Sequence, residues 1–229
     1  MKDAIYIPAY SDGLMSMFYS MDDDEIAKKY QPDFKQKKSV RIYNKKYDTY
    51  FYNPYMLISA GTQYQKTNFR EKLDIGDECK IFVDSGGYQL AMGTVNAEKF
   101  TDEVALKWSE ANGNIFPILD RPAFSKLYDY NFSLTSSLNS AKYYQENRSR
   151  SDADVLNVLQ GQNKEDMENW YKEISKYKFN GWGFGGSKGN MALVGLSILI
   201  LLNNGEFDRE DCKYLHIFGV SSNEIMVYL

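Results

Sequence analysis

A repeated alternation of short apolar runs and longer segments of helical period constrains this chain more than any other feature. From about residue 55, six strand-like runs alternate with helical candidates, and the ends of the runs lie 26 to 39 residues apart. That spacing is the length of a βα unit. Apolar strands that alternate with helices indicate a parallel sheet covered by helices. Two architectures fit, a doubly wound open sheet and a (β/α) barrel.

The six strand candidates all contain apolar runs and end in glycine or polar residues. They occupy 55–61, 80–87, 114–122, 154–161, 181–187 and 213–222. The clearest helical segments between them are 96–113, 133–147, 164–178 and 190–205. We therefore expect a (β/α) domain over residues 54–229.

The first 53 residues follow a different pattern. Apolar side chains alternate over 40–42 and again over 47–51, and residues 44–46 are suited to a turn. This alternation predicts a β-hairpin. We expect residues 1–53 to form an N-terminal extension that carries the hairpin.

The polar strand ends distinguish the two architectures. Five successive strands end in such residues, at 84–87, 120–122, 160–162, 185–187 and 219–222. In barrels the active site is built from loops at the carboxyl ends of several strands, whereas in an open sheet only strands beside the switch point carry it. The pattern favours a (β/α) TIM-type barrel. Because we count about six of the eight βα units, we expect an incomplete barrel.

The stretch DSGGYQ (84–89) places Asp84 at the end of an apolar strand. A carboxylate is costly there unless something uses it. Aspartate can cap a helix, but Gly86 and Gly87 weaken a helix start and permit close approach of a ligand. Tyr88 adds an aromatic face on which a planar ligand can stack. At this stage a structural and a catalytic role for Asp84 both remain open.

The later strand ends offer hydrogen-bonding groups. Asp120 is either an acceptor for a ligand or the ion-pair partner of Arg121. Gln160 has one amide acceptor and two donors, which suit the edge of a heterocycle or a loop backbone. Gly185 and Gly186 form either a tight turn or a backbone N–H site for a ligand carbonyl. The glycines match no nucleotide-binding fingerprint.

Composition narrows the function classes. The net charge of −4 gives no global basic footprint of a nucleic-acid-binding protein. Cys79 and Cys212 lie far apart and outside a CxxC pattern, which indicates free thiols. The one histidine, His216, lies in an apolar strand, where we expect a core residue, and no zinc-ligand cluster is evident. The run 191–202 is too short to cross a bilayer, and we expect a cytoplasmic protein without a signal peptide.

Five motifs in order give the chain a family resemblance. They are DSGGYQ (84–89), ILDRP (118–122), VLQG (158–161), GFGGS (183–187) and FGV (218–220). Over roughly residues 55–224 the sequence resembles the tRNA-guanine transglycosylase superfamily. Its short length and its richness in lysine, asparagine and tyrosine resemble the viral-type branch that inserts 7-deazaguanines into DNA, the deazapurine-in-DNA protein A group.

The resemblance implies base exchange in a nucleic acid without loss of the sugar-phosphate backbone. A carboxylate attacks the sugar, guanine leaves, and a preQ-type 7-deazaguanine takes its place. The target nucleotide must be turned out of its stack. No cofactor or metal is implied, and the partners are DNA or tRNA and the free base.

The resemblance also implies roles for individual residues. Asp84 is the general acid/base. The base-binding set comprises Tyr88 and Phe218 as stacking walls, Asp120 as acceptor from the purine N1 and amine, Gln160 and the Gly186 N–H as donors to the carbonyl, and Ser85, Gly87 and Gly185 within the same motifs.

The sequence departs from the family near its end. The nucleophilic aspartate of the family normally follows the FGV motif by about twenty residues and precedes a zinc-binding insertion, whereas here nine residues follow Val220. Three explanations stay open: a split or truncated gene, a binding protein without the nucleophile, or replacement by Asp208 or Asp211. Asp208 and Asp211 fall in a loop on the opposite face of the sheet, which argues against the third explanation, and the first is favoured.

Three functions therefore follow from the sequence. The first is a 7-deazaguanine transglycosylase, or the base-binding part of one. The second is a non-catalytic subunit that binds a base or nucleic acid and complements a partner chain. The third is an unrelated barrel enzyme that acts on a phosphorylated sugar. The basic clusters are solvated residues or phosphate contacts; they are Lys35, Lys37 and Lys38 with Arg41, and Lys45 with Lys46. If the protein is viral, the host cytoplasm is the expected location.

Overall fold

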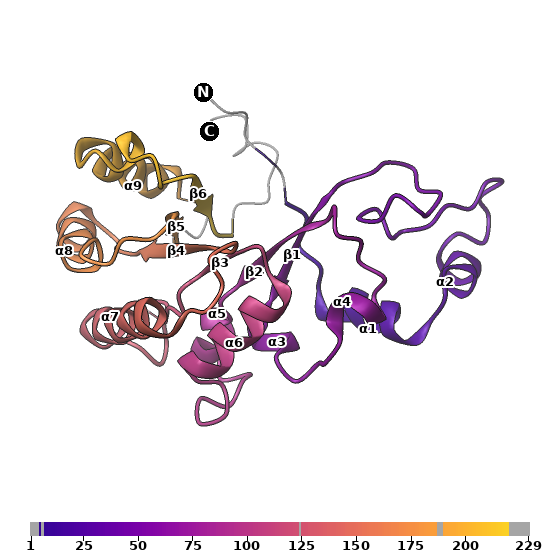
Figure 1. Cartoon of the computed structure of the whole chain (residues 1–229), viewed down its shortest axis with the longest axis horizontal. Helices are drawn as coiled ribbons and strands as arrows, with labels where there is room; N and C mark the ends of the chain where they lie inside the picture. The colour runs from indigo at the N-terminus through magenta and orange to yellow at the C-terminus, as the bar shows by residue number, and fades with distance from the viewer. Residues whose placement is uncertain (1–4, 6, 124, 187–189, 220–229) are drawn as a thin grey trace.

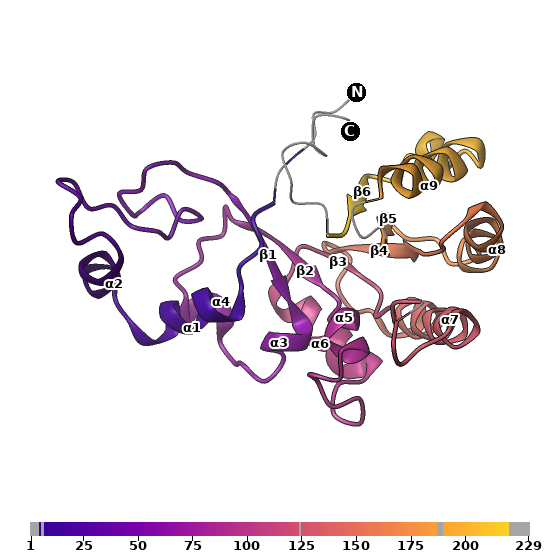
Figure 2. The same ribbon diagram turned by 180° about the vertical axis from the view of Figure 1, so that it is seen from behind.

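The computed structural model describes residues 5, 7–123, 125–186 and 190–219. Its centre is a six-stranded parallel sheet in the order β1-β2-β3-β4-β5-β6. From β1 to β6 the strands are Tyr55–Ser59, Lys80–Asp84, Ile115–Pro117, Asp154–Leu159, Gly181–Phe184 and Tyr214–Ile217. The sheet curls into a half-barrel, which Figures 1 and 2 show from opposite sides.

Helices connect the strands and cover the outer face of the sheet (Figure 1). The longer ones are α6 (Asp102–Asn112), α7 (Tyr130–Asn147), α8 (Lys164–Ile174) and α9 (Met191–Asn203), and the short ones are α3 (Ala60–Gln63), α4 (Phe69–Lys72), α5 (Gly87–Ala91) and the 3-10 helix η1 (Glu206–Asp208). Each longer helix begins where a side chain accepts a hydrogen bond from its first turn. The capping residues are Thr101, Asp129, Asn163 and Asn190.

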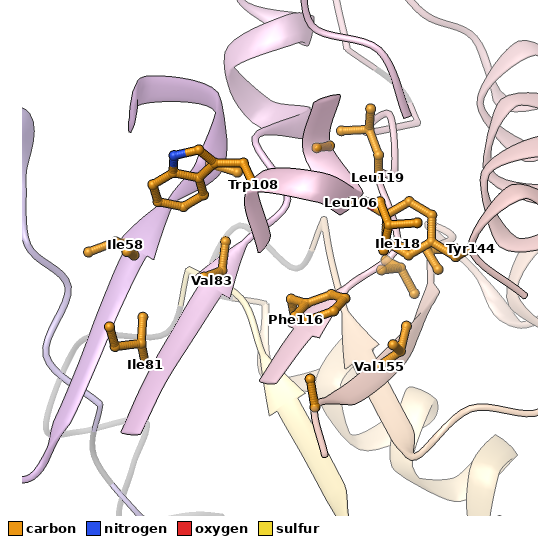
Figure 3. Packing of buried hydrophobic residues seen from close by; sticks show 14 of the residues in the cluster. Ile58, Ile81, Val83, Leu106, Trp108, Phe116, Ile118, Leu119, Tyr144 and Val155 are labelled. Atoms are coloured by element: carbon orange, nitrogen blue, oxygen red, sulfur yellow. The ribbon is translucent and has the colours of Figure 1, made fainter. Parts of the chain in front are cut away.

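The main core lies between the sheet and these helices. Because side chains alternate across a strand, Ile81 and Val83 of β2 point to the helices. In Figure 3, Val83 and Phe116 point toward the layer that holds Trp108 of α6 and Tyr144 of α7. The rings of Phe116 and Tyr144 meet edge to face with centroids 6.4 Å apart. This packing fixes the carboxyl ends of β2 and β3 relative to each other.

A second apolar layer lines the inner, concave face of the sheet. It contains Phe82, Ile115 and Leu156, with Leu57 and Tyr214 packed against them. Leu57 of β1 stands in register with Phe82, and Phe82 with Ile115. Barrel interiors are filled by such layers of inward side chains. The layer packs side chains of β1, β2, β3, β4 and β6 together on the concave face.

The N-terminal segment packs against β1. The Tyr10 N–H donates to the Leu57 carbonyl and the Leu57 N–H donates to the Pro8 carbonyl, both at 2.9 Å. Residues 8–10 therefore cover the outer edge of β1, which would otherwise expose unpaired backbone groups. Two helices follow, α1 (Asp12–Ser20) and α2 (Asp23–Tyr30), and α2 starts with a capping box between Asp22 and Glu25.

The predicted hairpin over residues 40–51 is wrong. The structure has a single isolated bridge there, between Ser39 and Thr49. Tertiary contacts replace the ladder: the Tyr43 hydroxyl donates to the Leu73 carbonyl at 2.9 Å, and the buried Arg41 guanidinium bonds to Asp23 at 2.8 Å. The burial and hydrogen bonds of these two side chains determine the conformation of the segment, and the hairpin that its alternating pattern predicts does not form.

The strand and helix order predicted for residues 54–229 is confirmed as far as residue 219; residues 187–189 and 220–229 lie outside the described residues. The sheet is parallel, the helices separate its strands, and the half-barrel is consistent with an incomplete TIM-like barrel. Among the described residues, no helix has both the length and the apolar character needed to cross a bilayer.

Candidate functional site

A cavity of about 840 Å3 opens where the strands end. Residues that follow β2, β3, β4 and β5 line it, together with β6 and the N-terminal Ile7 and Ala9. Pockets for small organic ligands usually measure about 300–1,000 Å3. Its size and its position at the carboxyl ends make this cavity the candidate site.

Asp84 ends β2 and lines the cavity. Burial raises the pKa of its carboxyl, while hydrogen bonds from Ser59 and from the backbone N–H groups of Ser85 and Gly86 act in the opposite direction. A carboxyl with a raised pKa can keep a proton and give it to a departing group. Asp84 is the one acidic residue in the described part of the cavity wall.

The two glycines after Asp84 allow neighbouring loops to touch. Gly86 has a φ of +87°, in the left-handed region, and a Cβ on it would lie 2.5 Å from the Gly61 nitrogen. A Cβ on Gly87 would lie 1.9 Å from the Asp120 carbonyl oxygen. The space was expected to admit a ligand, but backbone of α3 and of the loop after β3 occupies it. These glycines therefore position Asp84 and Asp120 rather than open a channel.

Asp120 is the centre of a buried hydrogen-bonded cluster. The Ser85 hydroxyl donates to its Oδ1 at 2.8 Å, and the Gln160 side-chain amide donates to its Oδ2 at 2.8 Å. Burial, reinforced by the nearby Asp84 charge and opposed by the Ser85 bond, raises the pKa of Asp120 to about 6. The alternative ion pair with Arg121 does not form among the described residues, since the Arg121 guanidinium donates to the Ser136 hydroxyl.

The side-chain amide of Gln160 makes its hydrogen bonds to other groups of the protein. Besides Asp120, its Nε2 lies 3.4 Å from the Arg121 carbonyl, and its Oε1 accepts from the Ala123 N–H at 2.6 Å. The side chain still lines the cavity. In this arrangement Gln160 links Asp120 and the loop after β3 to the cavity wall, and a ligand carbonyl would have to compete with these bonds.

The two glycines after β5, Gly185 and Gly186, differ in whether their backbone N–H is hydrogen-bonded. The Gly185 N–H donates to the Leu159 carbonyl at 3.1 Å, so it extends the sheet. Gly186 is exposed, has a φ of +87°, and its N–H has no hydrogen-bond partner in the described chain. Both residues line the cavity. Of these two glycines, Gly186 is the one whose N–H is available to a ligand oxygen.

Aromatic side chains flank the cavity. Tyr88, in the first turn of α5, is 62% exposed and lines the opening. Phe218 follows β6, and Gly183 makes room for it, since a Cβ there would lie 2.5 Å from the Phe218 ring. Exposed aromatic faces beside a cavity can stack on a planar ligand.

His216 lies in the cavity wall, which the sequence analysis did not predict. Its ring stacks on Phe82 with centroids 4.1 Å apart and meets Phe218 edge-on at 4.6 Å. Burial lowers the pKa of His216 to about 4, so the imidazole is neutral and offers one donor and one acceptor. The alternation of Leu215 and Ile217 with His216 could have placed it on the concave face.

Six of the nine predicted site residues share the cavity wall: Asp84, Tyr88, Gln160, Gly185, Gly186 and Phe218. Ser85, Gly87 and Asp120 lie behind it, as the support of Gln160 and Asp84. Ser125 and Lys126 also line the cavity and were missed, because the loop after β3 has no motif to mark it. The nine residues thus form one local structure of two layers.

The proposed replacement nucleophiles lie elsewhere. Asp208 ends η1, and Asp211 follows it, so both precede β6 at its amino end. Asp211 pairs with Arg209 at 3.0 Å. Neither acid lines the cavity, as expected for a loop on the opposite face.

Searches against protein-family models and against curated protein sequences found no match for this chain. The described residues also contain no group of three or more histidine, cysteine, aspartate or glutamate side chains placed to hold a metal ion.

Proposed function

We propose that this chain binds a 7-deazaguanine-type base and exchanges it for guanine in DNA or tRNA, or is the base-binding part of such a transglycosylase. One observation carries the proposal: a carboxyl of raised pKa, a free backbone N–H and two aromatic side chains meet in one cavity at the strand ends. A purine-like base presents a carbonyl, polar edges and two flat faces. The cavity offers a complement to each.

The chemistry assigned to the chain is proton transfer by Asp84. In base exchange the bond between sugar C1′ and guanine N9 breaks as a carboxylate oxygen bonds to C1′. The departing guanine takes a proton, which the Asp84 carboxyl supplies. When the incoming base displaces the carboxylate from C1′, Asp84 takes a proton from that base, which restores its acid form.

A second candidate is a base-binding subunit that acts with a partner chain. This candidate is favoured because the described part of the cavity wall holds no second acid that could attack C1′. It is also favoured by β6, whose outer edge pairs with no described strand, and by Leu199 and Leu202 of α9, which are 53% and 54% exposed. A partner strand against β6 and a partner helix against α9 would extend the half-barrel.

Base exchange separates the two candidates. The purified chain is incubated with labelled guanine and with DNA or tRNA, alone and with a candidate partner, and label in the nucleic acid is counted. Exchange by the chain alone supports the enzyme, and exchange only with the partner supports the subunit. We place either reaction in the cytoplasm.

Asp84→Asn tests the catalytic residue. The amide cannot exchange a proton, so exchange should fall by at least a hundredfold, while Asp77→Asn, at an exposed position before β2 and outside the cavity wall, should leave it unchanged. Equal exchange by Asp84→Asn and the unsubstituted chain would remove Asp84 from the mechanism. Binding of a phosphorylated sugar instead of a purine-type base would favour the unrelated barrel enzyme.

A further inference from the structure

The end of α2 and the loops packed on it form a surface with no role in the base cavity. This α2 surface comprises residues 28–38 and 48–51. We propose that it docks an unpaired stretch of the nucleic-acid substrate, with its aromatic rings stacking on bases and its lysines contacting phosphates. The inference deepens the proposed function, since it rests on a nucleic-acid substrate.

Charge separates this region from the rest of the chain. Residues 28–46 contain eight lysines and arginines and one acid, Asp33, although the whole chain carries −4. Ion pairs neutralise Lys38, Arg41 and Lys46. Within the α2 surface, four exposed lysines make no ion pair with a described residue; they are Lys28, Lys29, Lys35 and Lys37. Such local basic charge attracts phosphates.

Exposed aromatic rings stand among these lysines. Tyr30, Phe34, Tyr50 and Phe51 are 54–62% exposed. The Nζ atom of Lys29 lies 5.1 Å from the centroid of the Tyr30 ring. Proteins that bind single strands combine a basic path with aromatic faces for successive bases. A protein partner would use the rings equally well, but it would have to be acidic to pair with the lysines, whereas every nucleic acid carries phosphates for them.

Hydrogen bonds hold the surface together. The Gln31 side chain bonds to both backbone groups of Lys38, at 2.8 and 3.1 Å, which ties the loop to the end of α2. The Ser39 N–H donates to the Asp48 carbonyl at 2.8 Å, and the Tyr50 hydroxyl donates to the Gln36 carbonyl at 2.8 Å. The rings are thus presented from connected segments, which lowers the entropy lost when bases stack on them.

The α2 surface is remote from the last βα units. In Figures 1 and 2, α2 and the loop after it lie at the end of the molecule opposite α8 and α9. Variants on α8 and η1 therefore serve as matched controls. Lys172 is an exposed lysine of α8, and Phe207 is an exposed phenylalanine of η1.

Fluorescence anisotropy with a labelled twenty-nucleotide oligo-dT, titrated with the full chain at several salt concentrations, tests the proposal. Phe34→Ala and Phe51→Ala should each weaken binding about tenfold, because each removes a stacking face. Lys35→Gln with Lys37→Gln should also weaken it and should reduce the slope of log K against log salt by about 0.7 for each lysine. Phe207→Ala and Lys172→Gln should change neither quantity.

The proposal is overturned if the unsubstituted chain does not bind the oligonucleotide, or if the α2-surface variants bind like the controls. A blunt duplex of the same length should bind more weakly and should not respond to Phe34→Ala. A duplex that binds equally well would also overturn it. Binding of a free 7-deazaguanine base, measured on the same variants, should be unchanged. Loss of base binding alone would therefore count against the cavity and not against this surface.

Discussion

Two buried carboxylates, at opposite ends of the sheet, have opposite electrostatics. Asp120, behind the cavity, has neutral partners, the Ser85 hydroxyl and the Gln160 amide, and its pKa is raised to about 6. Glu206, in η1 at the amino end of β6, bonds to Trp182 and Tyr171 and pairs with the cation Arg209. Its pKa is lowered, because these bonds and the Arg209 charge outweigh burial.

The comparison shows that the charge of the partners decides what a buried acid does. Glu206 stays ionised and joins α8, β5 and η1. Asp120 lies close to a second acid and has no described cation bonded to it, so it binds a proton more readily. Acids and bases with shifted pKa values concentrate at functional sites, and an acid with a raised pKa can exchange a proton near neutral pH. This supports the region of Asp120, rather than that of Glu206, as the functional site.

Removal of the Glu206 carboxylate should give the largest effect on stability. Glu206→Ala leaves the Trp182 N–H and the Tyr171 hydroxyl without their acceptor and Arg209 without its partner. The free energy of unfolding should fall by about 3 kcal/mol in urea titrations. Lys178→Met is the control: Lys178 is 55% exposed and lies 3.4 Å from Glu206, so the change should stay below about 1 kcal/mol. Equal effects would remove the distinction between buried and exposed partners.

The pH dependence of stability should differ in sign between the two acids. Between about pH 4 and pH 6 the folded chain keeps the Asp120 proton that the unfolded chain releases, so the contribution of Asp120 to stability falls as pH rises. Asp120→Asn removes this contribution. Relative to the unsubstituted chain, the variant should gain up to about 3 kcal/mol between about pH 4 and pH 7.

Urea titrations across that range measure the effect, and Asp33→Asn should show no such gain. Glu206 behaves in the opposite way: its stabilisation is present above the ordinary pKa of glutamate and is lost as pH falls through its lower folded pKa. If the difference in stability between Asp120→Asn and the unsubstituted chain did not change with pH, Asp120 would be ionised like Glu206.

Loss of the Ser85 hydroxyl should give a smaller effect. Ser85→Ala removes a bond that lowers the pKa of Asp120, so that pKa should rise above about 6, and stability at neutral pH should fall by about 1 kcal/mol. In Ser85→Ala, the fall in stability that accompanies deprotonation of Asp120 should therefore extend to higher pH than in the unsubstituted chain. Ser136→Ala, which removes a hydroxyl bonded to Arg121 instead, should leave the pH profile unchanged. An unshifted profile in Ser85→Ala would contradict the cluster geometry.

The sequence was sufficient for the strand order and for one wall of the site. Strand-end residues such as Asp84 and Gly186 were predictable, because parallel strands bring their carboxyl ends to one edge. The support layer was not, since Gly87 and Asp120 meet through a loop contact that no local pattern encodes. The N-terminal region was misread for the same reason: Arg41 and Tyr43 are fixed by partners distant in the sequence.

Binding of a free 7-deazaguanine base to Tyr88→Ala tests the central claim most directly. Tyr88 is 62% exposed, so the substitution should leave the fold intact, and Tyr30→Ala, at 54% exposure, is the matched control outside the cavity. By isothermal titration calorimetry, Tyr88→Ala should bind the base at least tenfold more weakly than the unsubstituted chain, and Tyr30→Ala should bind it equally well. No binding by the unsubstituted chain, or equal affinity for both variants, would show that the cavity is not a base site.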